Sequence, residues 1–100
     1  MEYKERLREV IRKLHGHDSK HLETVPVKEW FQGKVIWDGE VEVFELVGHP
    51  DATLCYSWSY ADDDGKEQFT AVLGVGPVVS AQASVKAALI AKVKNGPEKT

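Results

Sequence analysis

Cysteine is nearly absent from this chain of 100 residues, since Cys55 is the only one. A single cysteine cannot form an internal disulfide, which excludes a small secreted fold held together by disulfide bridges. No apolar run approaches the ~18 residues that a membrane-spanning helix needs. The opening residues, Met1–Arg6, carry too many charges to begin a secretory signal. We therefore expect a cytoplasmic protein that does not associate with membranes.

The composition is that of an ordinary globular domain. Hydrophobic residues make up 42% of the chain and charged residues 29%, which is typical of neither a disordered nor a fibrous protein. A chain of this length is expected to form one domain, residues 1–100. The net charge of −3 is unevenly spread, because residues 38–67 contain nine acidic residues and one basic residue, Lys66. No run reaches about five like charges, so we interpret the acidic stretch as solvated surface rather than as an interaction tail.

The chain is predicted to begin and end with an amphipathic helix. In residues 1–15, apolar side chains recur at the period of a helix, at Tyr3, Leu7, Val10, Ile11 and Leu14. Gly16 suits the left-handed conformation that ends such a helix. In residues 81–94, the apolar face consists of Val85, Ala88, Leu89 and Val93. Ser80 is a suitable N-cap for this second helix, and Asn95-Gly96-Pro97 stops it.

The region between the helices has the alternation of β-strands. We interpret residues 17–24 as a polar linker, through which Pro26 prevents a helix. Residues 34–73 are predicted to form antiparallel strands, with the first turn at Asp38-Gly39, a dipeptide that suits a type I′ turn. A break in the alternation at Val43–Phe44 predicts a β-bulge. The expected fold class is α+β: an N-terminal helix, an antiparallel meander of three to four strands and a C-terminal helix, with both helices on one face of the sheet.

Aromatic side chains provide the candidate ligand-binding face. Tyr56, Trp58 and Tyr60 alternate along one strand and so share a face, which Trp37 and Phe69 can join from neighbouring strands. If this face is exposed, it is a stacking platform for a ligand. The opposite face of the strand is small and polar, so we favour the alternative that the aromatic face is core. In that case Trp58 packs against helix residues from the set Leu7, Ile11, Leu89 and Val93.

A group of histidines is the candidate metal site. His15, His17 and His21 lie close in sequence, beside Asp18, and zinc takes three or four such ligands. The group starts at the end of a helix, where the helix dipole alone favours a histidine, and continues into the predicted linker. We therefore expect no metal and no cofactor, and a metal-dependent function at these three histidines is an alternative.

No set of side chains has the pattern of a catalytic site. Cys55 could form a nucleophile set with His49 and Asp51, but it lies in mid-strand, away from the turns and helix starts that stabilise a thiolate. The loop Asp62–Gly65 lacks the glycine and glutamate spacing of an EF-hand calcium loop. The sequence therefore favours a protein that is not an enzyme, with no catalytic residue.

Three segments resemble a family of short bacterial proteins to which no activity is attached. They are WDGEVEVFEL at residues 37–46, GHPDA at residues 48–52 and CYSWS at residues 55–59. The likeness covers roughly residues 25–90, and a long match in several parts is more specific than a short motif. It implies a bacterial origin and assigns no role to any residue.

The order of elements also resembles the double-stranded-RNA-binding domain, in which a helix, an antiparallel meander and a second helix form two layers. In that family, a basic cluster at the start of the final helix binds phosphates. Here the matching stretch, Ser80–Lys86, has a single lysine, and the predicted turn around Asp38–Glu40 is acidic. Both departures remove phosphate contacts, which supply much of the affinity for nucleic acids.

The sequence favours a small bacterial, cytoplasmic binding or protein-interaction module without enzymatic activity. Its candidate ligand-face residues are Tyr56, Trp58 and Tyr60. A protein that binds nucleic acid through its basic helices is one alternative, although nucleic acid is not the partner that we expect. A metal-dependent function of His15, His17 and His21 is the other.

Overall fold

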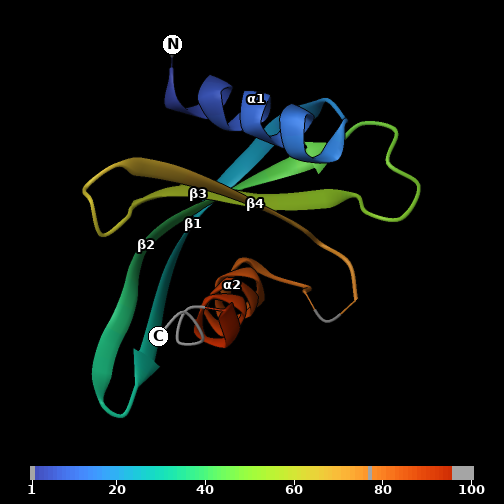
Figure 1. Cartoon of the computed structure of the whole chain (residues 1–100). Coiled ribbons are helices and arrows are strands. Elements are labelled where there is room, and N and C mark those ends of the chain that lie inside the picture. The colour runs from blue at the N-terminus through green and yellow to red at the C-terminus, as the bar shows by residue number, and fades with distance from the viewer. Residues whose placement is uncertain (1, 77, 96–100) are drawn as a thin grey trace.

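The predicted α+β fold is confirmed by the computed structural model, which describes residues 2–76 and 78–95 (Figure 1). The elements are α1 (Tyr3–His15), β1 (Ser19–Phe31), β2 (Lys34–Leu46), β3 (Leu54–Ala61), β4 (Glu67–Leu73) and α2 (Ala81–Asn95). The strands form one antiparallel sheet in the order β1-β2-β3-β4. Sequential neighbours therefore pair throughout the sheet, as short connections predict.

Both helices form where the apolar period predicts them. α1 buries Leu7 and Ile11 completely, and Gly16 ends it in the left-handed conformation, with its N–H donated to a carbonyl one turn back. At the start of α2, the Ser80 hydroxyl accepts a hydrogen bond of 3.1 Å from the N–H of Ala83, which is the predicted N-cap. Within the described part of the chain, no helix is long and apolar enough to cross a membrane.

The prediction of a polar linker at residues 17–24 is wrong, because most of that stretch belongs to the edge strand β1. Pro26 lies within this strand, opposite Glu40 of β2. Proline has no N–H to donate, and an edge strand tolerates it because one side of the strand has no neighbour. Proline thus excludes a helix here, as predicted, without excluding a strand.

The turn between β1 and β2 is at Gln32 and Gly33 rather than at Asp38-Gly39. Their φ angles of 52° and 78° are both positive, as a two-residue type I′ turn requires. Asp38 and Gly39 instead lie inside the hairpin, where they pair with residues of β1. The first hairpin is therefore longer than predicted, and its turn is at Gln32-Gly33 rather than at the dipeptide with the stronger turn signal.

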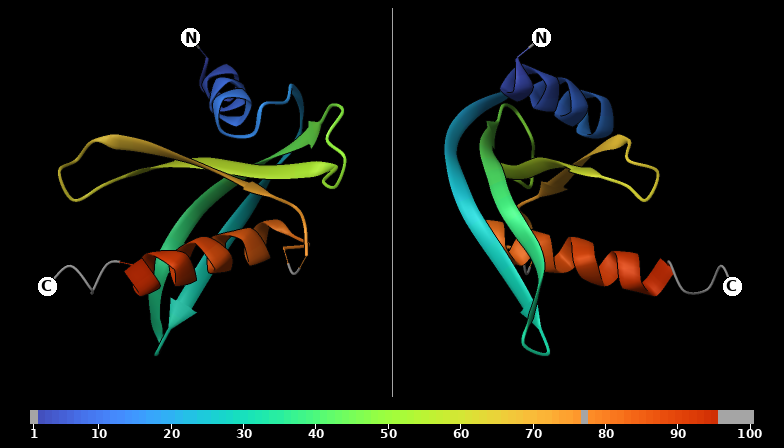
Figure 2. Two further views of the ribbon diagram at one scale, coloured as in Figure 1. Left: turned by 45° about the vertical axis from the view of Figure 1, so that its right-hand side comes forward. Right: turned by 90° about the vertical axis from the view of Figure 1, so that its left-hand side faces the viewer.

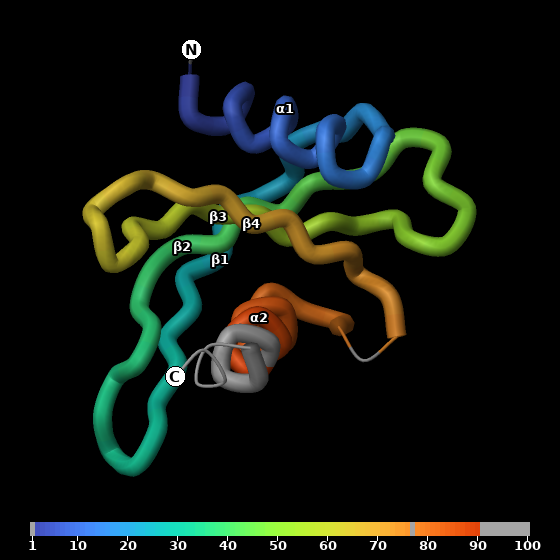
Figure 3. Tube along the Cα trace, in the orientation of Figure 1, coloured from blue at the N-terminus to red at the C-terminus, as the bar shows by residue number. Residues whose placement is uncertain are grey.

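The sheet consists of two hairpins that share a short seam. β2 pairs with β3 only over Glu42–Glu45 and Leu54–Ser57, whereas β1 with β2, and β3 with β4, pair along most of their length. Away from the seam the hairpins diverge, and α2 lies in the angle between them (Figures 2 and 3). This divergence leaves room between the sheet and α2.

The two helices cover opposite faces of the sheet, which corrects the prediction that both lie on one face. α1 packs on Phe44, Leu46 and Cys55, and α2 packs on a face that includes Val43 and Trp58. The β3–β4 hairpin lies between the helices (Figures 1 and 2). The physical reason is that β2 and β3 bury apolar side chains on both faces, and each face needs a cover. The one-face arrangement assumed in the resemblance to the double-stranded-RNA-binding domain is absent from the described residues.

Burial on both faces also explains the change of pattern at Val43–Phe44, which is not a bulge in β2. The two side chains are 4% and 0% exposed, and they belong to the clusters on opposite faces. The extra residue lies in β1 instead: Leu22 separates His21 from Glu23, which pair with Phe44 and Val43. Two consecutive apolar residues in a strand can therefore mean that both faces of the sheet are covered, and they do not by themselves indicate a bulge.

Trp58 is part of the core, as predicted, but on the face of α2 alone. It is 3% exposed and shares an apolar cluster with Val85 and Leu89. Leu7 and Ile11 belong to the separate cluster on the α1 face, so the predicted contact of Trp58 with them is wrong. The side chain of Val93 lies outside the described residues.

Candidate functional site

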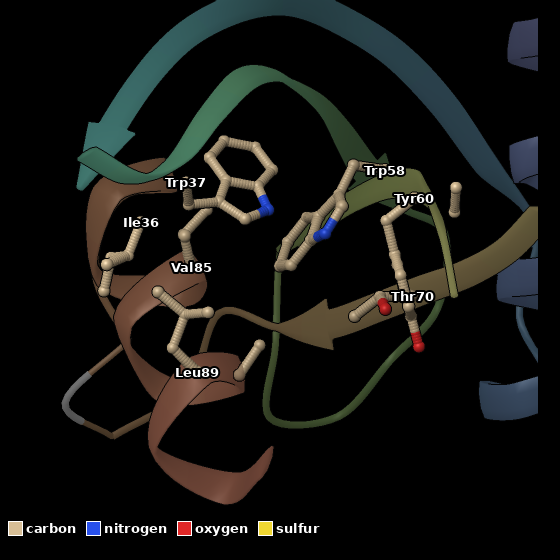
Figure 4. A pocket seen from close by; sticks show the side chains of 9 residues that line it. Ile36, Trp37, Trp58, Tyr60, Thr70, Val85 and Leu89 are labelled. Carbon is tan, nitrogen blue, oxygen red and sulfur yellow. The ribbon is translucent and has the colours of Figure 1, made fainter. Parts of the chain in front are cut away.

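A cleft of about 360 Å³ lies between α2 and the sheet, where the two hairpins diverge. Each of its walls comes from a different element (Figure 4). The lining residues are Ile36 and Trp37 of β2, Trp58, Tyr60 and Ala61 of β3, Thr70 of β4, and Val85, Ala88 and Leu89 of α2. The cleft is mainly apolar and aromatic, which is typical of a small-molecule site. We call it the aromatic cleft.

The alternation of β3 positions two of the three predicted ligand-face residues in the aromatic cleft. Trp58 is buried in its floor and Tyr60, 39% exposed, lies at its rim. Figure 4 shows Trp58 between Trp37 and Tyr60. Trp58 therefore fits both interpretations of the aromatic face. It is buried, as a core residue is, and it also lines a cavity, as a ligand-binding residue does.

The third predicted residue, Tyr56, lies elsewhere on the same face. It lines a second cavity, of about 380 Å³, beside the start of α2 and together with Glu23 and Ser80. Burial, and to a smaller extent the negative charge of Glu23, raises the pKa of the Tyr56 hydroxyl. Phe69, which we expect to join the aromatic face, is on the α1 side instead, where the Arg6 guanidinium lies 4.9 Å from the centre of its ring.

Trp37 and Trp58 form an aromatic corner in the wall of the aromatic cleft. Their ring centres are 5.8 Å apart and their planes meet at 73°, an edge-to-face arrangement that aromatic pairs prefer. Neither indole N–H donates a hydrogen bond to a described residue, and neither nitrogen is among the buried atoms that lack a partner. An indole N–H group that has no other acceptor can donate to a ligand.

The lining of the aromatic cleft carries no ionised side chain among the residues that the structure describes. Its polar groups are the two indole N–H groups and the hydroxyl groups of Thr70 and Tyr60. Such a lining offers contact area and hydrogen bonds, and it contains no carboxylate, imidazole or thiol that could move a proton or attack a substrate.

The three candidate metal-binding histidines point to different partners. His15 Nε2 lies 3.0 Å from the carbonyl of Ala71, and His17 Nδ1 lies 3.3 Å from that of Val47. His21 Nε2 lies 2.7 Å from a carboxylate oxygen of Glu42. Within residues 2–76 and 78–90, no three side chains of the types that bind metals are placed to hold an ion together.

Glu42 is the centre of a buried polar cluster that sequence reasoning does not find. It is 5% exposed on the α1 side of the sheet, and it accepts a hydrogen bond of 2.5 Å from the Thr24 hydroxyl besides the contact with His21. The only sequence signal is an acidic residue in a strand whose neighbours are apolar. A buried carboxylate needs such partners, and we interpret the cluster as structural.

The residues of the imagined nucleophile set have structural roles. Cys55 is fully buried, and burial raises the pKa of its thiol to about 12, which keeps it protonated. His49 Nδ1 accepts hydrogen bonds from the backbone N–H groups of Asp51 and Ala52, at 3.0 and 2.9 Å. His49 therefore holds the loop between β2 and β3, and its motif GHPDA is explained by that loop.

The arginines of α1 are committed to neighbouring carboxylates. Arg6 pairs with Glu67 at 2.7 Å, Arg8 with Glu5 at 2.9 Å and Arg12 with Asp18 at 2.6 Å. Paired guanidinium groups contribute less to a phosphate-binding surface than free ones, because the existing ion pair must first be broken. The arrangement gives the nucleic-acid alternative no particular support.

The tip of the first hairpin is an exposed apolar surface. It is not predicted from the sequence, because the turn is expected at Asp38-Gly39. Its exposed side chains are Trp30, Phe31, Val35 and Ile36. Ile36 also lines the aromatic cleft, so the tip and the rim of the cleft are adjacent. Grouped exposed apolar side chains are typical of contact surfaces.

Comparisons with protein-family models, with curated proteins and with solved structures find no match to this chain.

Proposed function

We propose that this protein is a non-catalytic binding module that holds a small ligand in the aromatic cleft. The observation that carries the proposal is the corner of Trp37 and Trp58, with a ring-centre distance of 5.8 Å and with two indole N–H groups that donate to no described residue. In a core that only stabilises the fold, indole N–H groups usually find a partner.

The size and chemistry of the aromatic cleft support a small ligand. A volume of about 360 Å³ is at the lower end of the range for small-molecule sites. Its walls are aromatic and aliphatic, with a few hydroxyl and N–H groups, which is the usual combination for binding and orienting an organic molecule. The polar groups of the described lining are indole N–H and hydroxyl groups, which suit the binding and orientation of a ligand.

Quinoline, a two-ring heterocycle that is uncharged at neutral pH, is a suitable first probe. We expect it to shift the indole N–H signals of Trp37 and Trp58 in two-dimensional ¹H–¹⁵N NMR. Trp30 is an internal control, because it is 59% exposed on the hairpin tip and is not one of the described lining residues. The titration should saturate at millimolar concentration or below, where a dissociation constant of ~1 mM corresponds to ~4 kcal/mol.

Filling the aromatic cleft should abolish these shifts. Ala88→Phe places a ring in the cleft from α2, and Lys86→Phe adds the same ring at an exposed position of the same helix. We expect the first variant to lose quinoline binding and the second to keep it. Quinoline shifts that are absent from Trp37 and Trp58, or that survive in folded Ala88→Phe, would overturn the proposal.

A further inference from the structure

The chemistry of the lining also specifies the class of ligand, an inference that rests on the proposed function. We infer that the aromatic cleft selects an uncharged, flat ring system with a hydrogen-bond acceptor at its edge. Three properties of the cleft carry this inference: the geometry of the aromatic corner, the absence of ionised groups in the described lining, and the two indole donors.

The aromatic corner favours a flat ring. The planes of Trp37 and Trp58 meet at 73°, so a ligand ring can stack on one indole while its edge meets the other. Stacking and edge-to-face contacts are the two preferred geometries of aromatic pairs. Tyr60 stands at the other side of Trp58 (Figure 4) and adds a third aromatic wall. An aliphatic ligand of the same volume would fill the space without using these surfaces.

The electrostatics of the aromatic cleft favour an uncharged ligand. No described lining residue is acidic or basic, and two acidic residues next to the lining already have partners. Asp62, next to the lining residue Ala61, accepts hydrogen bonds from Gln68 and from two backbone N–H groups. Asp38, next to Trp37, lies 3.8 Å from Lys28. A charged ligand would leave water without a counter-charge in the described lining, which is costly.

The indole donors favour a ligand that carries an acceptor. The N–H groups of Trp37 and Trp58 donate to no described residue, and Trp58 is only 3% exposed. A ligand that displaces water from these donors without accepting a hydrogen bond leaves them unpaired, which lowers its affinity. A ring nitrogen or a carbonyl oxygen at the edge of the ring would replace that water.

Four probes of similar size separate these requirements. Quinoline is uncharged and has a ring nitrogen that accepts a hydrogen bond, naphthalene has the same shape and no acceptor, N-methylquinolinium is a cation on the same frame, and 2-naphthoate is an anion. We expect quinoline to bind about fivefold more tightly than naphthalene, which is the effect of one net hydrogen bond. We expect it to bind at least about tenfold more tightly than either ion.

The indole signals and two matched variants identify the donor. Quinoline should move the N–H proton of Trp37 or of Trp58 downfield, as a new hydrogen bond does, whereas naphthalene should not. Replacing the donating residue, by Trp37→Phe or Trp58→Phe, keeps an aromatic wall and should reduce quinoline affinity to that of naphthalene. Trp30→Phe, at the hairpin tip, should change neither affinity.

The possible results distinguish this inference from the proposed function. Equal affinities of quinoline and naphthalene would overturn the requirement for an acceptor. Binding of N-methylquinolinium or 2-naphthoate as tight as that of quinoline would overturn the requirement for an uncharged ligand. In both cases the aromatic cleft would still be a binding site. If none of the four probes shifts the signals of Trp37 and Trp58, the proposed function itself is wrong.

Discussion

The indole ring of Trp37 lies against Gly39, two residues further along the same strand. A Cβ atom at Gly39 would stand 3.2 Å from the ring carbon Cη2 of Trp37. Glycine in a strand often marks such a close approach. Gly39 is therefore needed for space rather than for a positive φ angle. The missing side chain leaves room for the Trp37 ring in the wall of the aromatic cleft.

Gly39→Val should push the Trp37 ring away and disturb the aromatic corner. Crowding of this kind typically costs ~1–3 kcal/mol, and the indole N–H signals of Trp37 and Trp58 should both move. Gly33→Ala is the matched control, because Gly33 has a positive φ of 78° and nothing within 4 Å of its virtual Cβ. It should lower the free energy of unfolding by ~1 kcal/mol through backbone strain and leave the Trp37 signal unchanged.

Substitutions on the two faces of the sheet should have independent effects on stability. Leu7 and Trp58 belong to clusters on opposite faces, whereas Leu7 and Phe44 share one. Leu7→Ala alone should cost ~2–5 kcal/mol. In urea unfolding, its cost should add to that of Trp58→Leu within ~0.5 kcal/mol and should fail to add to that of Phe44→Leu. Strong coupling between Leu7 and Trp58 would contradict the two-sided core.

Glu29 should be a site where a less polar residue stabilises the protein. It is 7% exposed, and its Oε2 atom is buried without a hydrogen-bond partner among the described residues. Burying such a group is unfavourable, so Glu29→Met should raise the free energy of unfolding by about 1 kcal/mol or more. Glu23→Met, at an exposed position of the same strand, should change it by less than about 0.5 kcal/mol. A loss of stability in Glu29→Met would contradict this account.

The turn between β3 and β4 should weaken in acid because of Asp62. A hydrogen bond from the Gln68 amide, and others from the backbone N–H groups of Lys66 and Asp64, lower the pKa of Asp62 below its ordinary value of 3.8. A carboxyl group whose pKa is lower in the folded than in the unfolded state stabilises the fold. This contribution is complete at pH values above the ordinary pKa, and it is lost as the pH falls through the lowered pKa.

The stability difference between the wild type and Asp62→Asn should therefore shrink as the pH is lowered below 3.8, and be constant at neutral pH. Urea unfolding at a series of pH values measures it. Asp63→Asn, in the same turn, is the control for the loss of one negative charge. A difference that stays constant down to strongly acidic pH would mean that the Asp62 carboxylate contributes nothing to the turn.

The thiol of Cys55 should be unreactive in the folded protein. It is fully buried, and its pKa of about 12 leaves almost no thiolate at neutral pH. Ellman's reagent should label it only as fast as the protein unfolds, and the rate should rise steeply with urea. Rapid labelling in the absence of urea would show that the α1 face opens readily.

The helices and β3 are predictable from the sequence because their patterns are local. The apolar stripe of α1 and the alternation from Leu54 to Tyr60 each lie within one element, so no distant part of the chain decides them. β1 is different. Its sequence alternates weakly, and Pro26 is compatible with a strand only because β1 is at an edge, which is a property of the whole sheet.

The position of α2 could not be predicted from the sequence, and neither could the complete aromatic cleft. Trp58 and Tyr60 share a strand face by simple alternation, and this part of the site is predictable. The contributions of Thr70, Val85 and Leu89 depend on which face α2 covers and on how far the hairpins diverge. The spacing of apolar side chains predicts that a helix packs on the sheet, but it does not determine which face of the sheet the helix covers.

The short seam between β2 and β3 has a consequence for hydrogen exchange. The hairpin tip at Gln32 and Gly33 can open alone, because its neighbours are exposed. The seam has Phe44 and Cys55 buried against α1, with Val43 and Tyr56 on the side of α2. Its amides cannot meet solvent until both layers separate, which amounts to global unfolding. The slowest deuterium uptake should thus be confined to the seam, although β2 and β3 pair over fewer residues than β1 and β2 or β3 and β4.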